Sequence, residues 1–152
     1  MGDYKKIIIG GICSSVFLFS GCMNSDTQNE IQEIEKVDTK SIILKSVSAT
    51  EFKSFTDKIT KNDTQNIILD MRTLEEFNAG HIENAIMLDF YKQDFTQKLS
   101  QLDKSKTYFI YCSSGNRTGQ ALKIMKKLEF TNVYNLKYGI NDWNKNKFLV
   151  VE

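Results

Sequence analysis

Short apolar runs alternate, from about residue 41 onward, with segments whose apolar residues recur at helical spacing. The runs are at most six residues long and rich in β-branched and aromatic residues, which is typical of buried parallel strands. They fall at 42–47, 66–70, 85–88, 107–111 and 133–136. The segments between them predict helices that begin near Ser48, Leu74, Phe95 and Thr118, and a closing segment carries Ile140 and Trp143. Alternating strands and helices predict an α/β fold with a central parallel β-sheet flanked by helices on both faces.

The loop between the run at 107–111 and the following helix carries the candidate chemistry. It begins with Cys112 and ends with Arg117, and the residues between them are Ser113, Ser114, Gly115 and Asn116. Such a loop can curl into a cup whose amides, together with the helix N-terminus, favour an anion or a thiolate at its centre. Gly115 suits a backbone position with positive φ. Thr118 is expected to be the N-cap of the helix.

Cys112 is therefore expected to be reactive. The loop amides and the charge of Arg117 should lower the pKa of its thiol from ~8.5 to roughly 3.5–7.5, so that the thiolate predominates near neutral pH. The alternative is a small apolar residue buried at the end of a strand, which is common for a lone cysteine. The coincidence of Cys, Gly and Arg between a strand and a helix favours the reactive interpretation.

The first 22 residues predict export. Lys5 and Lys6 precede an apolar run at 7–19, which is too short and too rich in small residues for a transmembrane helix. The end of this segment resembles a bacterial lipoprotein signal, in which Cys22 would be lipidated with fatty acid such as palmitate, although Phe19 stands where Leu is usual. The alternative is an uncleaved anchor. The predicted organisation is a signal peptide at 1–21, a polar lipid-anchored tether at 22–40 and a domain at 41–152, exported and attached to the extracytoplasmic face of a bacterial membrane.

Charge and cysteine content narrow the functional classes. The net charge is +1 and there is no basic patch, so a nucleic-acid partner is not expected. If Cys13 is removed with the signal and Cys22 carries lipid, Cys112 is the one thiol left and no intramolecular disulfide can form. An unpaired thiol is unusual in an exported domain, which favours a chemical use for it.

Three stretches resemble the rhodanese family: 69–85, 111–118 and 136–143. The resemblance implies a three-layer rhodanese-like fold and a single-domain sulfurtransferase. In this family, the loop cysteine takes sulfane sulfur from a donor such as thiosulfate or a persulfide, and passes it to a thiol or cyanide. Cys112 would then be the catalytic residue, and the loop from Ser113 to Arg117 would bind the substrate. No metal or organic cofactor is needed, and Asp70, Arg72, Glu76 and His81 match structural positions.

Two departures from the family pattern bear on this interpretation. Ser113 stands where thiosulfate-using members often carry a basic residue, which puts the preference for a dianionic donor in question. Asn84 and Lys137 stand where glycine is usual, and both are expected to affect turns only.

Two other functional classes fit a reactive cysteine in this loop. Cysteine-dependent phosphatases and arsenate reductases also close such a loop with arginine, but phosphatases place five residues between Cys and Arg, whereas this chain has four. A module that senses oxidants or reactive sulfur, or binds a partner, needs the same accessible thiolate without turnover. The sequence leaves open the donor, the acceptor, any protein partner and the oligomeric state.

Overall fold

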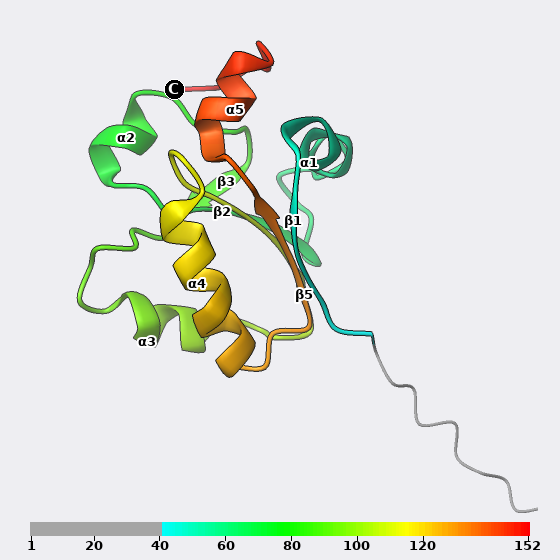
Figure 1. Ribbon diagram of the computed structural model, residues 1–152, viewed down its shortest axis with the longest axis vertical. Coiled ribbons are helices and arrows are strands. Elements are labelled where there is room, and N and C mark those ends of the chain that lie inside the picture. The colour runs from blue at the N-terminus through cyan, green and yellow to red at the C-terminus, as the bar shows by residue number, and fades with distance from the viewer. Residues whose placement is uncertain (1–40) are drawn as a thin grey trace, which may run out of the picture. The chain divides into compact units, whose positions relative to one another are not determined.

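The computed structural model describes residues 41–152, which form five strands and five helices (Figure 1). The strands are β1 (Ile43–Val47), β2 (Asn66–Asp70), β3 (Ala85–Met87), β4 (Thr107–Tyr111) and β5 (Asn132–Leu136). The helices are α1 (Ala49–Thr56), α2 (Leu74–Asn78), α3 (Phe95–Ser100), α4 (Asn116–Lys127) and α5 (Gly139–Lys145). The predicted elements are all present, with boundaries shifted by up to two residues at most ends.

The five strands form one parallel sheet in the order β1-β5-β4-β2-β3. β4 lies at the centre, between β5 and β2. Because all strands run in the same direction, their carboxyl ends meet at one edge of the sheet, where loops in such folds carry functional groups. The predicted parallel α/β architecture is confirmed.

Apolar clusters on the two faces of the sheet hold the helices in place. One cluster joins Phe52 of α1 and Trp143 of α5 to Phe109 of β4. The other joins Leu99 of α3 and Met125 of α4 to Ile110, the next residue of β4. Since neighbouring residues of a strand point to opposite faces, this alternation places α1 and α5 on one face and α3 and α4 on the other. Helices on both faces were predicted.

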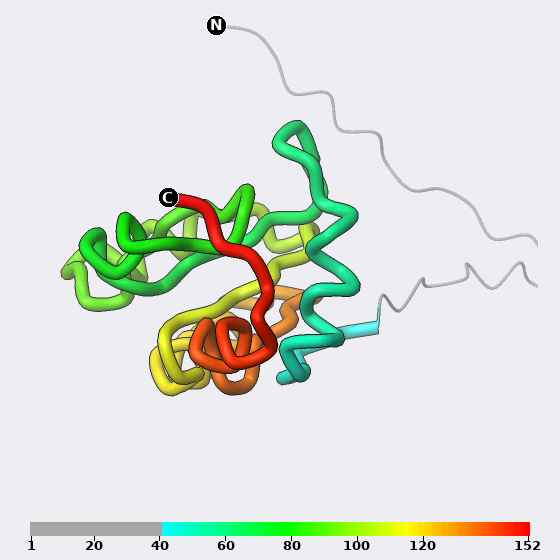
Figure 2. The backbone as a smooth tube through the Cα atoms, turned by 90° about the horizontal axis from the view of Figure 1, so that it is seen from above, coloured from blue at the N-terminus to red at the C-terminus, as the bar shows by residue number. Residues whose placement is uncertain are grey.

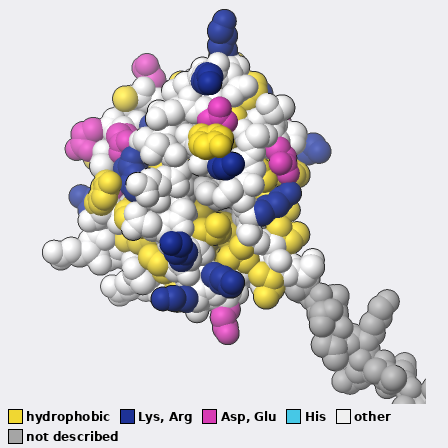
Figure 3. Space-filling view, in the orientation of Figure 1, with side chains coloured by type: hydrophobic (Ala, Val, Ile, Leu, Met, Phe, Trp, Pro, Cys, Tyr) yellow, Lys and Arg dark blue, Asp and Glu magenta, His cyan; other side chains and the backbone are white. Residues whose placement is uncertain are grey.

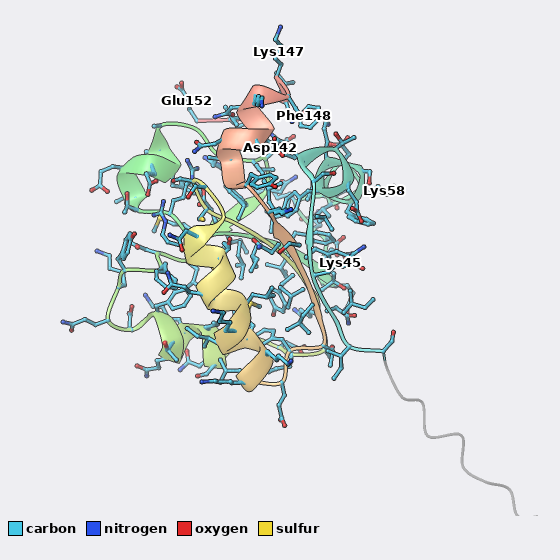
Figure 4. All side chains as sticks on the ribbon, in the orientation of Figure 1. Lys45, Lys58, Asp142, Lys147, Phe148 and Glu152 are labelled. Atoms are coloured by element: carbon cyan, nitrogen blue, oxygen red, sulfur yellow. The ribbon has the colours of Figure 1, made fainter. Side chains whose placement is uncertain are left out.

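The end of the chain closes one side of the domain. Figure 2 shows the red segment after α5 running to the green segment after α2, where His81 and Val151 form an antiparallel bridge. Figure 4 labels Asp142 on α5, and its carboxylate accepts a hydrogen bond of 3.3 Å from the amide of Ala49 at the start of α1. These contacts hold α1, α5 and the segment after α2 together.

The prediction for Thr118 is wrong. Gly115 adopts the left-handed conformation, and α4 begins directly after it, at Asn116. Thr118 therefore lies in the first turn of the helix, and its hydroxyl is shared between the carbonyl of Gly115, at 3.2 Å, and the sulfur of Cys112, at 3.7 Å. The predicted cap at Ser48 does form, with the Ser48 hydroxyl accepting from the amide of Glu51.

The N-terminal predictions lie outside the described residues: the signal at 1–21, the lipidation of Cys22 and the tether at 22–40. Within residues 41–152, no helix has the length and apolar character needed to cross a membrane.

Candidate active site

Cys112 lies at the carboxyl end of β4, the central strand, where the chain enters the loop to α4. Its side chain is buried, and its sulfur accepts a hydrogen bond of 3.1 Å from the amide of Gly115. The hydroxyl of Thr118 lies 3.7 Å from the same sulfur. The loop thus folds back over its first residue and points polar hydrogens at the sulfur, as the cup interpretation predicts.

The surroundings of Cys112 favour its thiolate. Burial by itself raises the pKa of the Cys112 thiol, because a charged sulfur loses hydration. Hydrogen bonds from the amide and hydroxyl of Thr118, and from the amides of Gly115 and Ser114, outweigh burial and leave the pKa below its usual value. The pKa of the Cys112 thiol is therefore lowered, as expected, and the cause is the first turn of α4 together with the loop amides.

Two glycines allow the turn before α5 to pack directly against this loop. Gly115 has φ +88°, and a methyl group there would lie 1.9 Å from the carbonyl oxygen of Lys137. Gly139 has φ +65°, and a methyl group there would lie 2.4 Å from the carbonyl oxygen of Cys112. That same carbonyl accepts a hydrogen bond of 2.8 Å from the amide of Ile140. The loop geometry thus depends on β5 and α5 as well as on its own residues.

Arg117 does not bring an unpaired positive charge to the loop. Both of its terminal nitrogens donate to the carboxylate of Glu76 on α2, each at 2.7 Å. One of them also donates to the hydroxyl of Ser113 at 2.6 Å, and that hydroxyl contacts Glu76. The expectation that Arg117 supplies a full positive charge to the cup needs correction, because Glu76 neutralises it.

The pair between Glu76 and Arg117 stabilises both charged forms. The pKa of Glu76 is far below its usual range, chiefly because Arg117 donates to the carboxylate, with Ser113 and the amide of Thr73 adding further hydrogen bonds. The pKa of Arg117 is raised, mainly by the same carboxylate. Arg117 also lies over the ring of Tyr91, an exposed residue, at 5.3 Å from the ring centre.

The remaining loop residues face outward. Ser114 and Asn116 are exposed, while Ser113 and Arg117 are partly buried. The structure therefore brings Cys112, Gly115 and Thr118 together at the sulfur, and joins Ser113 and Arg117 to Glu76 beside it. The catalytic and binding roles of these residues stay predictions.

Asp70, Arg72 and His81 make their contacts at the end of β2 and in the segment that follows it. Asp70 and Arg72 form a buried ion pair of 2.6 Å, and the guanidinium also donates to the carbonyl of Gly80 at 2.8 Å. The ring of His81 stacks on Phe77 at 3.8 Å. Its Nδ1 lies 3.2 Å from the carbonyl oxygen of Phe77. None of these contacts involves Cys112, so the three residues hold the segment after β2 in shape.

The contacts of Glu76 with Arg117 and of Thr118 with the Cys112 sulfur were not predicted from the sequence. Thr118 was expected to cap α4, and Glu76 to have a structural role only. Thr73 and Glu76 do form a capping box at the start of α2, which is a recognisable local signal. A second signal is Arg117 itself. A partly buried guanidinium usually has an acidic partner, and no acidic residue lies near Arg117 in the sequence, so the partner had to come from another element.

No group of three or more His, Cys, Asp or Glu residues within residues 41–152 is placed to hold a metal ion. Figure 3 shows Lys and Arg side chains spread over one face of the domain, and no continuous basic surface covers that face.

A sequence model of the rhodanese-like domain matches residues 51–146. The chain therefore belongs to the rhodanese-like domain family. The match runs from within α1 to the end of α5, so it covers four of the five strands and includes the whole loop from Cys112 to Arg117.

Individual relatives carry names from sulfur chemistry and RNA modification. YrkF of Bacillus subtilis (strain 168), named as a candidate sulfur carrier, is 29% identical over 98 residues, covering 64% of this chain and 51% of YrkF. A mitochondrial protein of Schizosaccharomyces pombe, named as a candidate thiosulfate sulfurtransferase, is 30% identical, covering 68% of this chain and 82% of that protein. The tRNA uridine(34) hydroxylase of Pelagibacter ubique is 34% identical over 86 residues, covering 56% of this chain but 29% of the hydroxylase.

Solved structures show the same fold. A rhodanese-related protein from Thermoplasma volcanium has a TM-score of 0.59 at 24% identity, covering 70% of this chain and 97% of that one. A rhodanese-like domain protein from Staphylococcus aureus has a TM-score of 0.54 at 24% identity, covering 65% of this chain and 90% of that one.

Proposed function

We propose that the protein is a sulfurtransferase in which Cys112 carries the transferred sulfur. One observation carries the proposal: the sulfur of Cys112 accepts hydrogen bonds from the loop, and the pKa of the Cys112 thiol lies below its usual value. A thiolate is the nucleophile that sulfur transfer needs. The names of YrkF and of the yeast mitochondrial protein support the same chemistry.

The proposed reaction has two displacements. The Cys112 thiolate attacks the outer sulfur of the donor, a new S–S bond forms, and the old bond to that sulfur breaks, releasing sulfite from thiosulfate. An acceptor thiolate or cyanide then attacks the outer sulfur of the Cys112 persulfide, which regenerates the thiolate. No oxidant is consumed. The loop amides, including that of Gly115, would stabilise the negative charge on the persulfide.

Two features argue against phosphoryl chemistry at this loop. Four residues separate Cys112 from Arg117, one fewer than the phosphatase loop has. Arg117, which would have to bind the phosphate, uses both terminal nitrogens to bind Glu76. A carboxylate at that position would repel a phosphate dianion, so phosphatase and arsenate reductase activities rank below sulfur transfer.

The test is sulfur uptake by a form with Cys13→Ser and Cys22→Ser, in which Cys112 is the single thiol of the chain. After exposure to a sulfane donor, the intact mass should rise by one sulfur atom and fall again on addition of cyanide. The additional replacement Cys112→Ser should abolish the gain. A chain whose mass stays constant with both thiosulfate and an alkyl persulfide is not a sulfur carrier at Cys112.

A second candidate function is sensing of reactive sulfur or oxidants, because the lowered pKa of the Cys112 thiol also suits a residue that is modified without turnover. Turnover separates the two functions. A transferase releases many equivalents of product per chain, whereas a sensor stops after one equivalent.

We further propose the exported, lipid-anchored organisation for this chain: removal of residues 1–21, lipid on Cys22, a tether at 22–40 and the domain at 41–152. The proposal rests on Lys5, Lys6, the apolar run at 7–19 and the small residues before Cys22. Labelled palmitate should be incorporated in a bacterial host. Cys22→Ser should abolish the label and Cys13→Ser should leave it, and equal labelling of the Cys22→Ser form would contradict the anchor.

A further inference from the structure

Glu76 forms an ion pair with Arg117, the positively charged residue at the end of the active-site loop. Its two carboxylate oxygens each accept a hydrogen bond of 2.7 Å from a different terminal nitrogen of Arg117. One oxygen also contacts the hydroxyl of Ser113, and the other accepts from the amide of Thr73 at 3.0 Å. A donor that binds beside Cys112 therefore meets a guanidinium whose terminal nitrogens already bind a carboxylate.

The carboxylate of Glu76 and the guanidinium of Arg117 carry opposite charges, so the pair has no net charge. The carboxylate stays ionised at neutral pH, since the pKa of Glu76 lies far below its usual range. Ser113, which directly follows Cys112, adds no charge. Within the loop itself, an anion can still be attracted by the amides, such as that of Gly115, and by the N-terminus of α4. These partial charges suit one negative charge better than two, because the guanidinium at the end of the loop is already paired with a carboxylate.

We infer that Glu76 determines donor specificity: by neutralising Arg117 it makes the site accept sulfane donors of single negative charge in preference to dianionic thiosulfate. This inference rests on the proposed function, since it concerns which donor supplies sulfur to Cys112. Glu76 is 34% exposed and on a different element from Cys112, so it acts on the donor through charge and through the position of Arg117.

Two donors of similar shape isolate the effect of charge. Thiosulfate carries two negative charges, and methanethiosulfonate replaces one of its charged oxygens with a methyl group and carries one. In both, the Cys112 thiolate attacks the terminal sulfur and forms the same persulfide. The bond between the two donor sulfurs breaks, and its electron pair leaves with sulfite in the first case and with methanesulfinate in the second.

The experiment compares kcat/KM for the two donors in the full chain, with cyanide as acceptor and Cys112→Ser as background. Each rate is divided by that of a simple thiolate with the same donor, which removes intrinsic reactivity. The wild type should prefer methanethiosulfonate. Glu76→Gln should shift the ratio toward thiosulfate by about tenfold, because it removes one nearby negative charge, and the shift should be mainly in KM for thiosulfate.

The matched control is Glu75→Gln. Glu75 precedes Glu76 on α2 and is exposed, and the groups that shift its pKa are its own backbone, Thr73, Lys92 and Glu76, none of which belongs to the loop. Removing its charge should change the ratio by no more than about twofold, because exposed charges are screened. Glutamine at position 76 can keep the capping box with Thr73, so α2 is expected to form in the variant.

The outcomes separate the inference from the proposed function. If both donors load Cys112 but the ratio is the same in wild type and Glu76→Gln, the specificity role of Glu76 is wrong and sulfur transfer stands. If the normalised wild-type ratio favours thiosulfate, the inference is wrong whatever the variant does. If neither donor forms a persulfide on Cys112, the proposed function and the inference fail together.

Discussion

Two arginine–carboxylate pairs have a member between the end of β2 and α2, and they differ in burial. Asp70 and Arg72 form the first pair, with side chains 0% and 6% exposed. Glu76 and Arg117 form the second, with side chains 34% and 12% exposed. The first joins residues two positions apart, and the second joins α2 to the active-site loop 41 residues later.

The burial of each pair determines how much the pair contributes to the stability of the fold. Breaking a buried pair leaves an uncompensated charge without water, which costs far more than losing a screened pair near the surface. The Asp70–Arg72 pair also holds the carbonyl of Gly80, and the guanidinium lies over the ring of Tyr111. The first pair therefore belongs to the scaffold, while the second affects the charge at the site with a smaller part in stability.

The largest expected effect is on the buried pair. Arg72→Ala should lower the free energy of unfolding by about 3–5 kcal/mol, because Asp70 is left buried without its partner. Denaturant unfolding measures the loss. The control is Lys98→Ala, which breaks an exposed pair with Asp94 and should cost less than about 1 kcal/mol. Equal losses in the two variants would contradict the assignment of Arg72 to the scaffold.

Gly115→Ala should affect scaffold and site together. The added methyl group meets the carbonyl oxygen of Lys137 at 1.9 Å and the residue must keep φ near +88°, so a loss of about 2 kcal/mol or more is expected. Sulfur uptake by Cys112 should fall as well, since the Gly115 amide binds its sulfur. The control is Gly119→Ala in α4.

A methyl group at Gly119 contacts nothing within 4 Å. Since alanine favours helix over glycine, Gly119→Ala should stabilise the chain by about 0.5–1 kcal/mol. Thermal or denaturant unfolding of the two glycine variants gives both values. A Gly115→Ala variant as stable as Gly119→Ala would show that the loop tolerates a different backbone path.

Glu76→Gln should cost about 1 kcal/mol at neutral pH, because the pair with Arg117 is partly solvated. The pKa of Glu76 is lowered in the folded chain, so its contribution is present above the unfolded value of about 4.3 and is lost as the pH falls. Unfolding measured from pH 7 downward should show wild type and variant converging. A difference that stays constant below pH 4 would mean that the carboxylate charge is not the cause.

The smallest expected effect is at Thr118. Thr118→Val keeps the shape of the side chain but removes the hydroxyl beside the Cys112 sulfur, so the pKa of that thiol should rise. Ultraviolet absorbance of the thiolate against pH, with Cys112→Ser as the baseline, measures the change. Thr56→Val is the control, because that buried hydroxyl binds the carbonyl of Phe52 in α1 and not the loop. An unchanged titration in Thr118→Val would assign the low pKa to the amides alone.

The sequence was sufficient for the fold because its signals are local. The apolar runs of β2 and β4 and the helical spacing after Cys112 each identify an element within a few residues, and alternation then implies a parallel sheet. Ser48 likewise caps α1 as expected, through a bond within four residues. Gly115 has the positive φ that a glycine in the loop between a strand and a helix predicts.

The details of the site depend on contacts between distant residues, which periodicity does not reveal. Arg117 was expected to face the thiol, and only the three-dimensional arrangement shows that Glu76 of α2 pairs with it. Thr118 has the residue type of an N-cap, but the N-cap is the left-handed Gly115, three residues earlier. Composition alone could not distinguish these possibilities.

The most direct test of sulfur transfer through Cys112 is a single-turnover chase in the form with Cys13→Ser and Cys22→Ser. The chain is loaded with methanethiosulfonate, freed of donor and mixed with cyanide. We expect the persulfide on Cys112 to disappear at the rate at which thiocyanate forms, with one thiocyanate per loaded chain. Thiocyanate that forms while the persulfide persists, or a persulfide that cyanide does not discharge, would contradict sulfur transfer through Cys112.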